Sequence, residues 1–211
     1  MNKEDLIEAL KDINIDINEK QLEQLDQFYN LMIEWNEKIN LTRITEKKEV
    51  YLKHFYDSLT LNKVVDLKSI KTLCDVGTGA GFPGIVLKIV CPNIKITLID
   101  SLQKRVNYLN EVIKRLNLTD IEAIHTRGED YKGKYEVVTS RAVANIEKLV
   151  EYTMHLVEKN GLFVAMKGNI EEELTDSVQQ KIAKKYKIEK IVKFKLPIEE
   201  SQRSLVVLKN K

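Results

Sequence analysis

The sequence predicts an α/β fold, in which an N-terminal helical extension precedes a mostly parallel sheet that ends in an antiparallel hairpin. Three observations lead to this prediction. The first 62 residues show the helical spacing of apolar side chains. From residue 69 onward, strand and helix patterns alternate, as they do in a parallel sheet covered by helices. The last two strand patterns, residues 187–197 and 202–210, are separated by only four residues, which is too few for a parallel crossover.

Length and composition are those of a globular protein. The chain has 211 residues, of which 43% are hydrophobic and 31% are charged. It has no run of 18 apolar residues and its N-terminus is too charged for a secretory signal, so we expect a soluble, cytoplasmic protein with no membrane contact. We divide it into an N-terminal helical extension, residues 1–62, and a second domain, residues 63–211.

The cysteines and histidines suggest neither a disulfide nor a metal site. Cys74 falls in a strand pattern and Cys91 follows a helix pattern, so both are expected to be small core residues. The three histidines lie far apart in sequence, with no cysteine or carboxylate near them at metal-binding spacing. We therefore predict no metal.

Charge is unevenly distributed along the chain, although the net charge is only +2. Residues 1–62 hold 8 basic and 13 acidic side chains, whereas residues 178–211 hold 10 basic and 3 acidic ones. The lysine-rich C-terminal part is either a solvated surface or a face that contacts phosphates, since clustered lysines bind nucleic acid without reading its sequence. Both interpretations stay open at this point.

The N-terminal helices are predicted from a cap and from periodicity. Asn18 and Gln21 form a capping-box pattern, and apolar residues then recur every three or four positions as far as Ile39. A second helix is expected over residues 47–61. His54 and Asp57 would share one face of it, and this spacing favours a surface or packing pair over a catalytic one.

The most informative segment is TLCDVGTGAGFPG, residues 72–84, because an apolar strand ending in an acid leads directly into a glycine loop. Glycines allow turn conformations that a side chain forbids, and they let a ligand approach the main chain. Phe82 and Pro83 are expected to start the following helix, whose N-terminus favours a negatively charged group. We therefore predict a small-molecule cofactor at this loop.

Two cofactors are compatible with the loop motif. Gly79, Gly81 and Gly84 form the GxGxxG pattern of dinucleotide-binding proteins, while Gly77, Gly79 and Gly81 form the GxGxG pattern of enzymes that use S-adenosylmethionine (SAM). Both classes need a second strand that ends in an acid. Asp100 ends the strand pattern KITLID, 21 residues after Gly79, at the spacing expected of a carboxylate that binds ribose hydroxyls.

The remaining elements continue the alternation. Strands are predicted at KTLCDV, KITLID, IEAIHT, YEVVTS and GLFVAMKG, and helices at GIVLKIV, LQKRVNYLNEVIKRLN and NIEKLVEYTMHLVEKN. Right-handed crossovers would place these strands in one sheet with helices on both faces. The antiparallel hairpin follows them.

The hairpin favours SAM over a dinucleotide. Parallel strands closed by an antiparallel pair describe the Rossmann-like sheet of class I SAM-dependent methyltransferases. The acid before the first glycine, Asp75, also suits a cofactor that carries an ammonium and a sulfonium group. Two alternatives are kept, namely an NAD(P)-binding Rossmann oxidoreductase and a regulatory protein that binds SAM without turnover.

The segment after the fourth strand constrains the methylation chemistry. Ser140, Arg141 and Ala142 stand where enzymes that methylate exocyclic amines commonly carry an Asn or Asp followed by two prolines. The cysteine nucleophile of cytosine C5 enzymes is missing as well. Guanine N7 needs neither a nucleophile nor a strong base, because its lone pair lies in the ring plane and carries no proton.

At this level of detail the chain resembles the RsmG family of ribosomal RNA small subunit methyltransferases, also called GidB, over nearly its whole length. The segments that carry the resemblance are NLTRI, HFYDSL, DVGTGAGFPG, LIDSLQKRVNYL, TSRAVA and MKG. The resemblance implies SAM-dependent methylation of a guanine at N7 in 16S ribosomal RNA.

The resemblance also implies the contacts of the cofactor. They fall on Gly77, Phe82, Gly128, Glu129 and Arg141, in addition to Gly79 and Asp100 from the motif. Phe82 would cap the loop, Glu129 would accept from the adenine amino group, and Arg141 would bind the methionine carboxylate or the guanine. The family usually has alanine where this chain has Gly128. No catalytic base is assigned.

Two further basic residues are predicted to face the RNA. Lys167 ends the fifth strand, close to Arg141, at the carboxyl edge of the sheet where ligands bind. Arg203 in the terminal hairpin is a second candidate for the same face.

Overall fold

A computed structural model describes residues 1–141 and 144–211. Ala142, which belongs to the predicted loop after the fourth strand, lies outside the described residues. The helices of eight or more residues are α1 (Lys3–Lys11), α2 (Glu19–Ile39), α6 (Gln103–Arg115), α7 (Ile146–Thr153) and α8 (Asp176–Lys185). The shorter ones are α3 (Lys47–Val50), α4 (Asp57–Leu59) and α5 (Gly84–Val90). The strands are β1 (Thr72–Val76), β2 (Lys95–Asp100), β3 (Ile121–His125), β4 (Tyr135–Arg141), β5 (Val157–Lys167), β6 (Tyr186–Lys195) and β7 (Gln202–Asn210).

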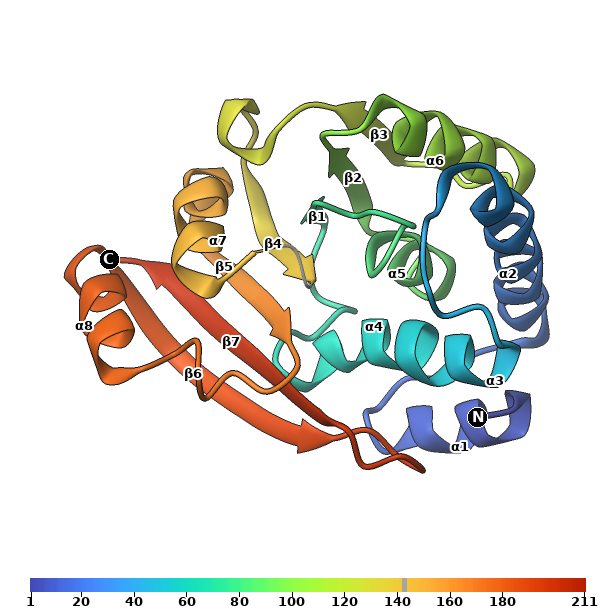
Figure 1. The fold of residues 1–211 in the computed structure, drawn as a ribbon, viewed down its shortest axis with the longest axis horizontal. Coiled ribbons are helices and arrows are strands. Elements are labelled where there is room, and N and C mark those ends of the chain that lie inside the picture. The colour runs from blue at the N-terminus through green and yellow to red at the C-terminus, as the bar shows by residue number, and fades with distance from the viewer. Residues whose placement is uncertain (142–143) are drawn as a thin grey trace.

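The described residues form one seven-stranded sheet in the order β3-β2-β1-β4-β5-β7-β6. The first five strands in this order run parallel, while β7 is antiparallel to both β5 and β6. This arrangement confirms the predicted parallel sheet and its antiparallel C-terminal hairpin. In Figure 1 the hairpin crosses the lower left of the molecule in red and orange.

Each face of the sheet is covered by a different set of helices. Leu73 packs into a core shared with the N-terminal helices, α5 and α6, whereas Cys74, the next residue of β1, packs into a core shared with α7 and α8. Figure 1 shows α2 and α6 on one side of the view and α7 with α8 on the other. Burial raises the pKa of the Cys74 thiol, which is consistent with the predicted core role.

The predicted capping box of α2 is present and also attaches the helix to the sheet domain. Asn18 accepts a hydrogen bond from the backbone of Gln21 at 2.9 Å, and the Gln21 side chain accepts from the backbone of Asn18 at 3.0 Å. The amide of Gln21 also donates to the carbonyl oxygens of Ile89 and Val90 at the end of α5. One side chain therefore caps α2 and fixes its position.

The predicted helix over residues 47–61 has a wider turn in its middle. After α3 the chain forms a π-helical segment, η1 (Tyr51–Tyr56), and then continues through α4 and a 3₁₀ turn at Thr60–Lys63. The backbone N–H of Asp57 reaches the carbonyl oxygen of Leu52, five residues earlier. Single π turns inside α-helices occur often at functional sites. This π turn contributes Lys53 and His54 to the lining of the cavity beside the glycine loop.

Two other boundaries differ from the sequence prediction. The helix expected over residues 145–160 ends at Thr153, and β5 begins at Val157, four residues before the expected strand. Val157 is fully buried and pairs with Tyr135, so burial and strand pairing override the helical periodicity there. Helix α8, capped by Thr175, was not predicted. Within the described ranges, no helix has the length and apolar character needed to cross a membrane.

Candidate active site

The glycine loop after β1 has the backbone that its sequence predicts. Gly77, Gly79 and Gly81 have φ values of +73°, +59° and +95°, in the left-handed region that glycine tolerates best. A Cβ atom at Gly79 would come no closer than 4.0 Å to its nearest neighbour, so a side chain there would enter open space. At Gly84 it would lie 2.2 Å from Leu98 Cδ2. The first position leaves room for a ligand, and the second allows close helix packing.

Asp75 lies beneath this loop and holds it in shape. Its Oδ2 atom accepts hydrogen bonds from the Thr78 hydroxyl at 2.7 Å and from the Gly84 backbone at 2.9 Å. Asp75 is fully buried, and burial raises the pKa of its carboxyl to about 6. The structure thus gives Asp75 a role in loop geometry, whereas its charge was expected to suit a cationic cofactor.

Asp100 lies across from the loop and lines the cavity. One carboxylate oxygen accepts from the backbone N–H of Gly79 at 3.0 Å, and the other accepts from Leu102 at 2.9 Å. Nη1 of Arg105 lies 3.4 Å from Oδ2 of Asp100. This acid therefore joins the ends of β1 and β2 at the place where the sequence predicts a ribose-binding carboxylate.

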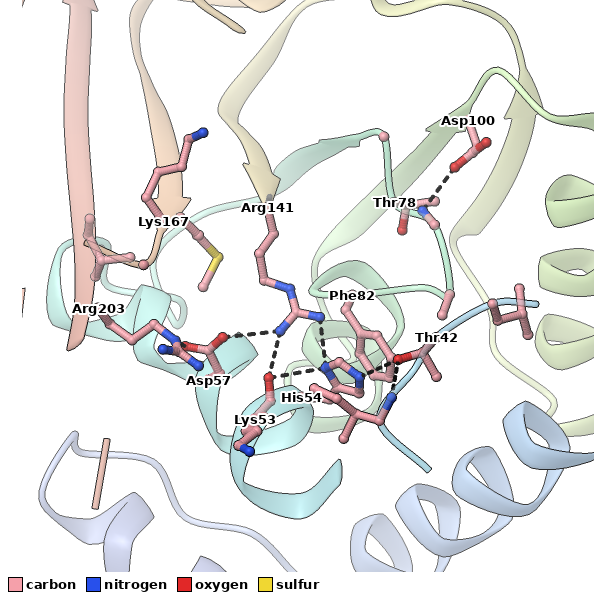
Figure 2. A pocket seen from close by; sticks show the side chains of 18 of the residues that line it. Thr42, Lys53, His54, Asp57, Thr78, Phe82, Asp100, Arg141, Lys167 and Arg203 are labelled. Atoms are coloured by element: carbon pink, nitrogen blue, oxygen red, sulfur yellow. Dashed lines mark hydrogen bonds and ion pairs between the residues drawn. The ribbon is translucent and has the colours of Figure 1, made fainter. Parts of the chain in front are cut away.

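A cavity of about 520 Å³ opens between this loop and the N-terminal extension. Its volume is within the usual range for small-molecule sites. One wall consists of the glycine loop and Asp100, and the opposite wall consists of Thr42, His54 and Asp57 (Figure 2). Arg141 projects between the two walls from the end of β4. The site therefore combines residues from both predicted parts of the chain.

Arg141 is the centre of the hydrogen-bond network in this cavity. Its Nη1 atom donates to the Lys53 carbonyl oxygen at 2.9 Å and to Asp57 Oδ2 at 3.1 Å, and its Nη2 atom is 3.0 Å from His54 Nδ1. The guanidinium also lies over the Phe82 ring, 5.1 Å from its centroid. These contacts hold the guanidinium in one orientation toward the cavity (Figure 2).

His54 is held neutral by its surroundings. Its ring stacks on Phe82 with centroids 4.3 Å apart, and its Nε2 atom is 3.1 Å from the Thr42 hydroxyl. Its Nδ1 atom lies 3.0 Å from Arg141 Nη2 and 3.1 Å from the carbonyl oxygen of Lys53. Burial, and then the charge of Arg141, lower the pKa of His54 to about 3.

The low pKa of His54 predicts a pH dependence of stability. The imidazole has an ordinary pKa of 6.5 and a folded-state pKa of about 3, so the unfolded chain takes up the proton first. The contribution of His54 is fully present above pH 6.5 and is lost as the pH falls toward 3. His54→Asn should give a flatter curve of unfolding free energy against pH over this range, measured by urea denaturation. If the wild type and His54→Asn gave parallel curves, the lowered pKa of His54 would be contradicted.

Asp57 joins two arginines, one at the end of β4 and one near the start of β7, that lie at the same edge of the sheet. It binds Arg141 through Oδ2, and its Oδ1 atom accepts from Arg203 Nε at 3.0 Å. Its side chain is only 8% exposed, so the two guanidinium groups replace water as its partners. The predicted RNA-facing residue Arg203 therefore borders the same cavity as Arg141.

Of the remaining predicted site residues, Lys167 lines the cavity, whereas Gly128 and Glu129 do not. Lys167 lines the cavity, forms a 2.9 Å ion pair with Glu173 and donates to the Ala144 carbonyl oxygen. Gly128 and Glu129 are not among the residues that line it. A Cβ atom at Gly128 would lie 2.8 Å from Val76, which gives a packing reason for glycine at this position. Glu129 follows it on the 3₁₀ turn η3 (Gly128–Asp130).

Sequence reasoning missed several residues of the site. Thr42, Lys53 and Asp57 were not assigned to it, and His54 with Asp57 was expected to be a surface or packing pair. The structure brings both to Arg141 rather than to each other. Thr42 lies in the segment NLTRI, and His54 and Asp57 lie in HFYDSL. Both segments carried the family resemblance, which was the available signal for these three residues. Among the described residues, no group of three or more His, Cys, Asp or Glu is arranged to hold a metal.

Solved structures of similar fold show the fold class of this protein. A SAM-dependent methyltransferase from Aquifex aeolicus aligns over 77% of this chain and 93% of its own, with a TM-score of 0.59 and 18% identity. Mitomycin 7-O-methyltransferase MmcR aligns over 92% of this chain and 69% of its own, with a TM-score of 0.61 and 10% identity. The fold is therefore that of the SAM-dependent methyltransferases, as predicted.

Sequence comparison gives the family. Residues 21–206 match the model of rRNA small subunit methyltransferase G. Ribosomal RNA small subunit methyltransferase G of Bacillus subtilis (strain 168) is 45% identical in an alignment 216 residues long. The alignment covers 99% of this chain and 90% of the relative. The protein of that name from Listeria monocytogenes serotype 4b is 42% identical over 217 residues, with the same coverage. The chain belongs to the rRNA small subunit methyltransferase G family.

Family and fold together identify SAM as the cofactor. The structure fits it, because the Gly79 position opens onto a cavity of suitable volume beside the buried acid Asp100. The comparisons support a methyltransferase, and they support neither the NAD(P)-dependent oxidoreductase nor the regulatory protein without turnover.

Proposed function

We propose that this protein transfers the methyl group of SAM to N7 of a guanine in the 16S ribosomal RNA of the small subunit. One observation supports the choice of N7 as the methylated atom, namely that the described residues lining the cavity include no free base. Asp57 binds two arginines, Asp100 binds backbone amides, and His54 is neutral with a pKa of about 3. Guanine N7 needs no deprotonation before it attacks.

The chain's own residues would bind and orient the two reactants. SAM supplies an electrophilic methyl group on a sulfonium. We propose that Gly77, Gly79 and Asp100 hold the cofactor and that Phe82 caps it. Arg141, fixed in orientation by its partners, would bind the methionine carboxylate or the guanine through its remaining donors. The chemistry then depends on alignment and on exclusion of water.

Gly128 and Glu129 remain proposed contacts of the adenine end. The turn that contains them follows β3, and β3 pairs with β2 so that His125 lies opposite Asp100. They therefore lie at the same edge of the sheet as the proposed ribose-binding acid. We further propose that residues 1–62 provide the target-side wall, that residues 63–211 form the SAM domain, and that Lys167 and Arg203 face the RNA.

Strand cleavage tests the proposed atom. A guanine methylated at N7 carries a fixed positive charge, which makes its ring and its glycosidic bond labile. We expect borohydride reduction followed by aniline to cut small-subunit RNA at one guanine after incubation with SAM and this protein. RNA incubated without SAM is the control. Incorporation of labelled methyl groups with no aniline-sensitive guanine would exclude N7 and leave the cofactor assignment intact.

A further inference from the structure

Asp57 is the acid on the cavity wall that lies opposite the glycine loop. Among the described residues that line the cavity, the acids are Asp57 and Asp100. Asp100 accepts from the backbone of Gly79 and is the proposed ribose contact. Asp57 lies on the other side, on the wall formed by the N-terminal extension (Figure 2). Its carboxylate therefore borders the space that the target base would occupy.

Asp57 keeps hydrogen-bonding capacity on both carboxylate oxygens. Its Oδ2 atom accepts from Arg141 Nη1 at 3.1 Å, and its Oδ1 atom accepts from Arg203 Nε at 3.0 Å. An ionised carboxylate has about four acceptor positions, and each of these bonds uses one. The side chain is mostly buried, and its residue lines the cavity. A ligand in the cavity can therefore donate to the positions that the two arginines leave free.

The neighbouring polar groups of this wall are engaged with one another. The Thr42 hydroxyl lies 3.1 Å from His54 Nε2, and the Lys53 carbonyl oxygen accepts from Arg141 at 2.9 Å. The Lys53 oxygen also lies 3.1 Å from His54 Nδ1. Of these groups, Asp57 has the most acceptor capacity left for a ligand.

Guanine is the base that matches such an acceptor. Its pairing edge carries two neighbouring donors, N1–H and the N2 amino group, which the two oxygens of one carboxylate can accept together. Adenine has an acceptor at N1, and an ionised carboxylate has no proton to donate to it. Enzymes that modify a base outside the stack read it by hydrogen bonds along this edge. A carboxylate on the target side therefore favours guanine over adenine.

The same contact would orient the base for methylation at N7. N7 lies on the opposite side of the guanine ring from the N2 amino group. A guanine held by Asp57 through N1–H and N2 therefore points N7 across the cavity, toward the wall that contains Gly79 and Asp100. The hydrogen bonds also engage N1 and N2, so one contact would account for the choice of base and for the choice of atom.

We propose that Asp57 selects guanine by accepting hydrogen bonds from N1–H and from the N2 amino group of the target base. The proposal rests on the proposed function, because it assumes a guanine target in this cavity. Arg141 and Arg203 compensate the charge of a carboxylate in this mostly buried place. The proposal requires no contribution of Asp57 to the binding of SAM.

The first test replaces the target guanosine of small-subunit RNA with inosine. Inosine lacks the N2 amino group and keeps N1–H, O6 and N7. Loss of one hydrogen bond to a charged group corresponds to at least roughly a tenfold lower kcat/KM. We expect this penalty for the wild-type protein, measured with labelled SAM. Equal kcat/KM values for the two RNAs would overturn the proposal.

Asp57→Asn links the inosine penalty to the carboxylate. The substitution keeps the size of the side chain and removes its charge. We expect slower methylation of the guanosine RNA, an unchanged Kd for SAM in calorimetry, and kcat/KM values for the two RNAs that agree within about twofold. Any intrinsic difference in reactivity between the two bases is the same for both proteins. An inosine penalty as large as that of the wild type would therefore contradict the proposal.

Arg141→Ala is the matched control, because it disturbs the same network and leaves Asp57 paired with Arg203. We expect methylation to slow with both RNAs and the inosine penalty to remain. Loss of the penalty in this variant as well would show general damage to the site and contradict the assignment to Asp57. Should Asp57→Asn not fold, the inosine penalty of the wild type still decides the proposal.

The proposed atom is tested independently of this inference. Aniline cleavage of unmodified RNA, methylated by the wild type, reports whether N7 carries the methyl group. Methyl incorporation without cleavage would refute the N7 assignment, whereas equal rates with guanosine and inosine would refute the role of Asp57. The two failures are therefore distinguishable.

Discussion

Gly79→Val should abolish SAM binding and leave the protein folded. The residue has φ = +59°, and its missing side chain leaves open space toward the cavity, so a valine would both strain the loop and occupy the cofactor's place. The strain costs about 1–3 kcal/mol, less than the roughly 5–15 kcal/mol by which a domain of ordinary stability is folded. We expect the Kd for SAM in calorimetry to rise by at least about 100-fold, or about 2.8 kcal/mol.

Two further glycine variants separate strain from obstruction. Asparagine tolerates left-handed backbone, so Gly79→Asn tests obstruction of the cavity with little strain and should also lose SAM binding. Gly84→Ala should instead lower the unfolding free energy, because its Cβ atom would meet Leu98 and Asp75. A folded Gly79→Val protein with wild-type SAM affinity would show that the loop is not the cofactor site.

Arg141→Ala should reduce methyl transfer by at least about 100-fold, because it removes the group that aligns the reactants. The unfolding free energy should fall by only about 1–3 kcal/mol, so the variant should stay folded, because Asp57 keeps Arg203 as a partner while the hydrogen bonds to Lys53 and His54 are lost. Initial rates with labelled SAM and urea denaturation measure the two effects. A variant with full turnover would remove Arg141 from the site.

Arg141→Lys is the matched control, since it keeps the charge and loses the planar fork. We expect the methyl-transfer rate of Arg141→Lys to be nearly as low as that of Arg141→Ala. The pKa of His54 provides an independent readout. It is lowered first by burial and second by the positive charge of Arg141, so removing that charge should raise it. In Arg141→Ala the pKa of His54 should rise above 3 and stay below 6.5, as followed by NMR titration. In Arg141→Lys it should change less.

The sheet could be predicted from sequence because its signals are local. The short connection at residues 198–201 excludes a parallel crossover, and the acid at the end of β2 follows the glycine loop at a fixed spacing. Boundaries failed where tertiary burial overrode local periodicity, as at Val157. The π turn over Tyr51–Tyr56 has no glycine or proline to announce it.

The cavity wall formed by the glycine loop and Asp100 was predicted from sequence, whereas the wall formed by Thr42, His54 and Asp57 was not. Gly79, Asp100 and Arg141 sit at strand ends, whose positions follow from the alternation of strands and helices. The partners of Arg141 lie 84 to 88 residues earlier in the chain, and nothing local relates them to it. Only the docking of the N-terminal helices onto the sheet brings them together.

The ion pair between Asp57 and Arg203 has a consequence for biosynthesis. It joins residues 146 positions apart, and β7, which carries Arg203, lies between β5 and β6 in the sheet. A ribosome that makes this protein must therefore synthesise the chain at least as far as Arg203 before the pair with Asp57 can form. Unfinished and prematurely terminated chains that lack β7 have no complete pocket. Because β7 is the last of the seven strands to be synthesised, this ion pair is among the last contacts of the cavity to form.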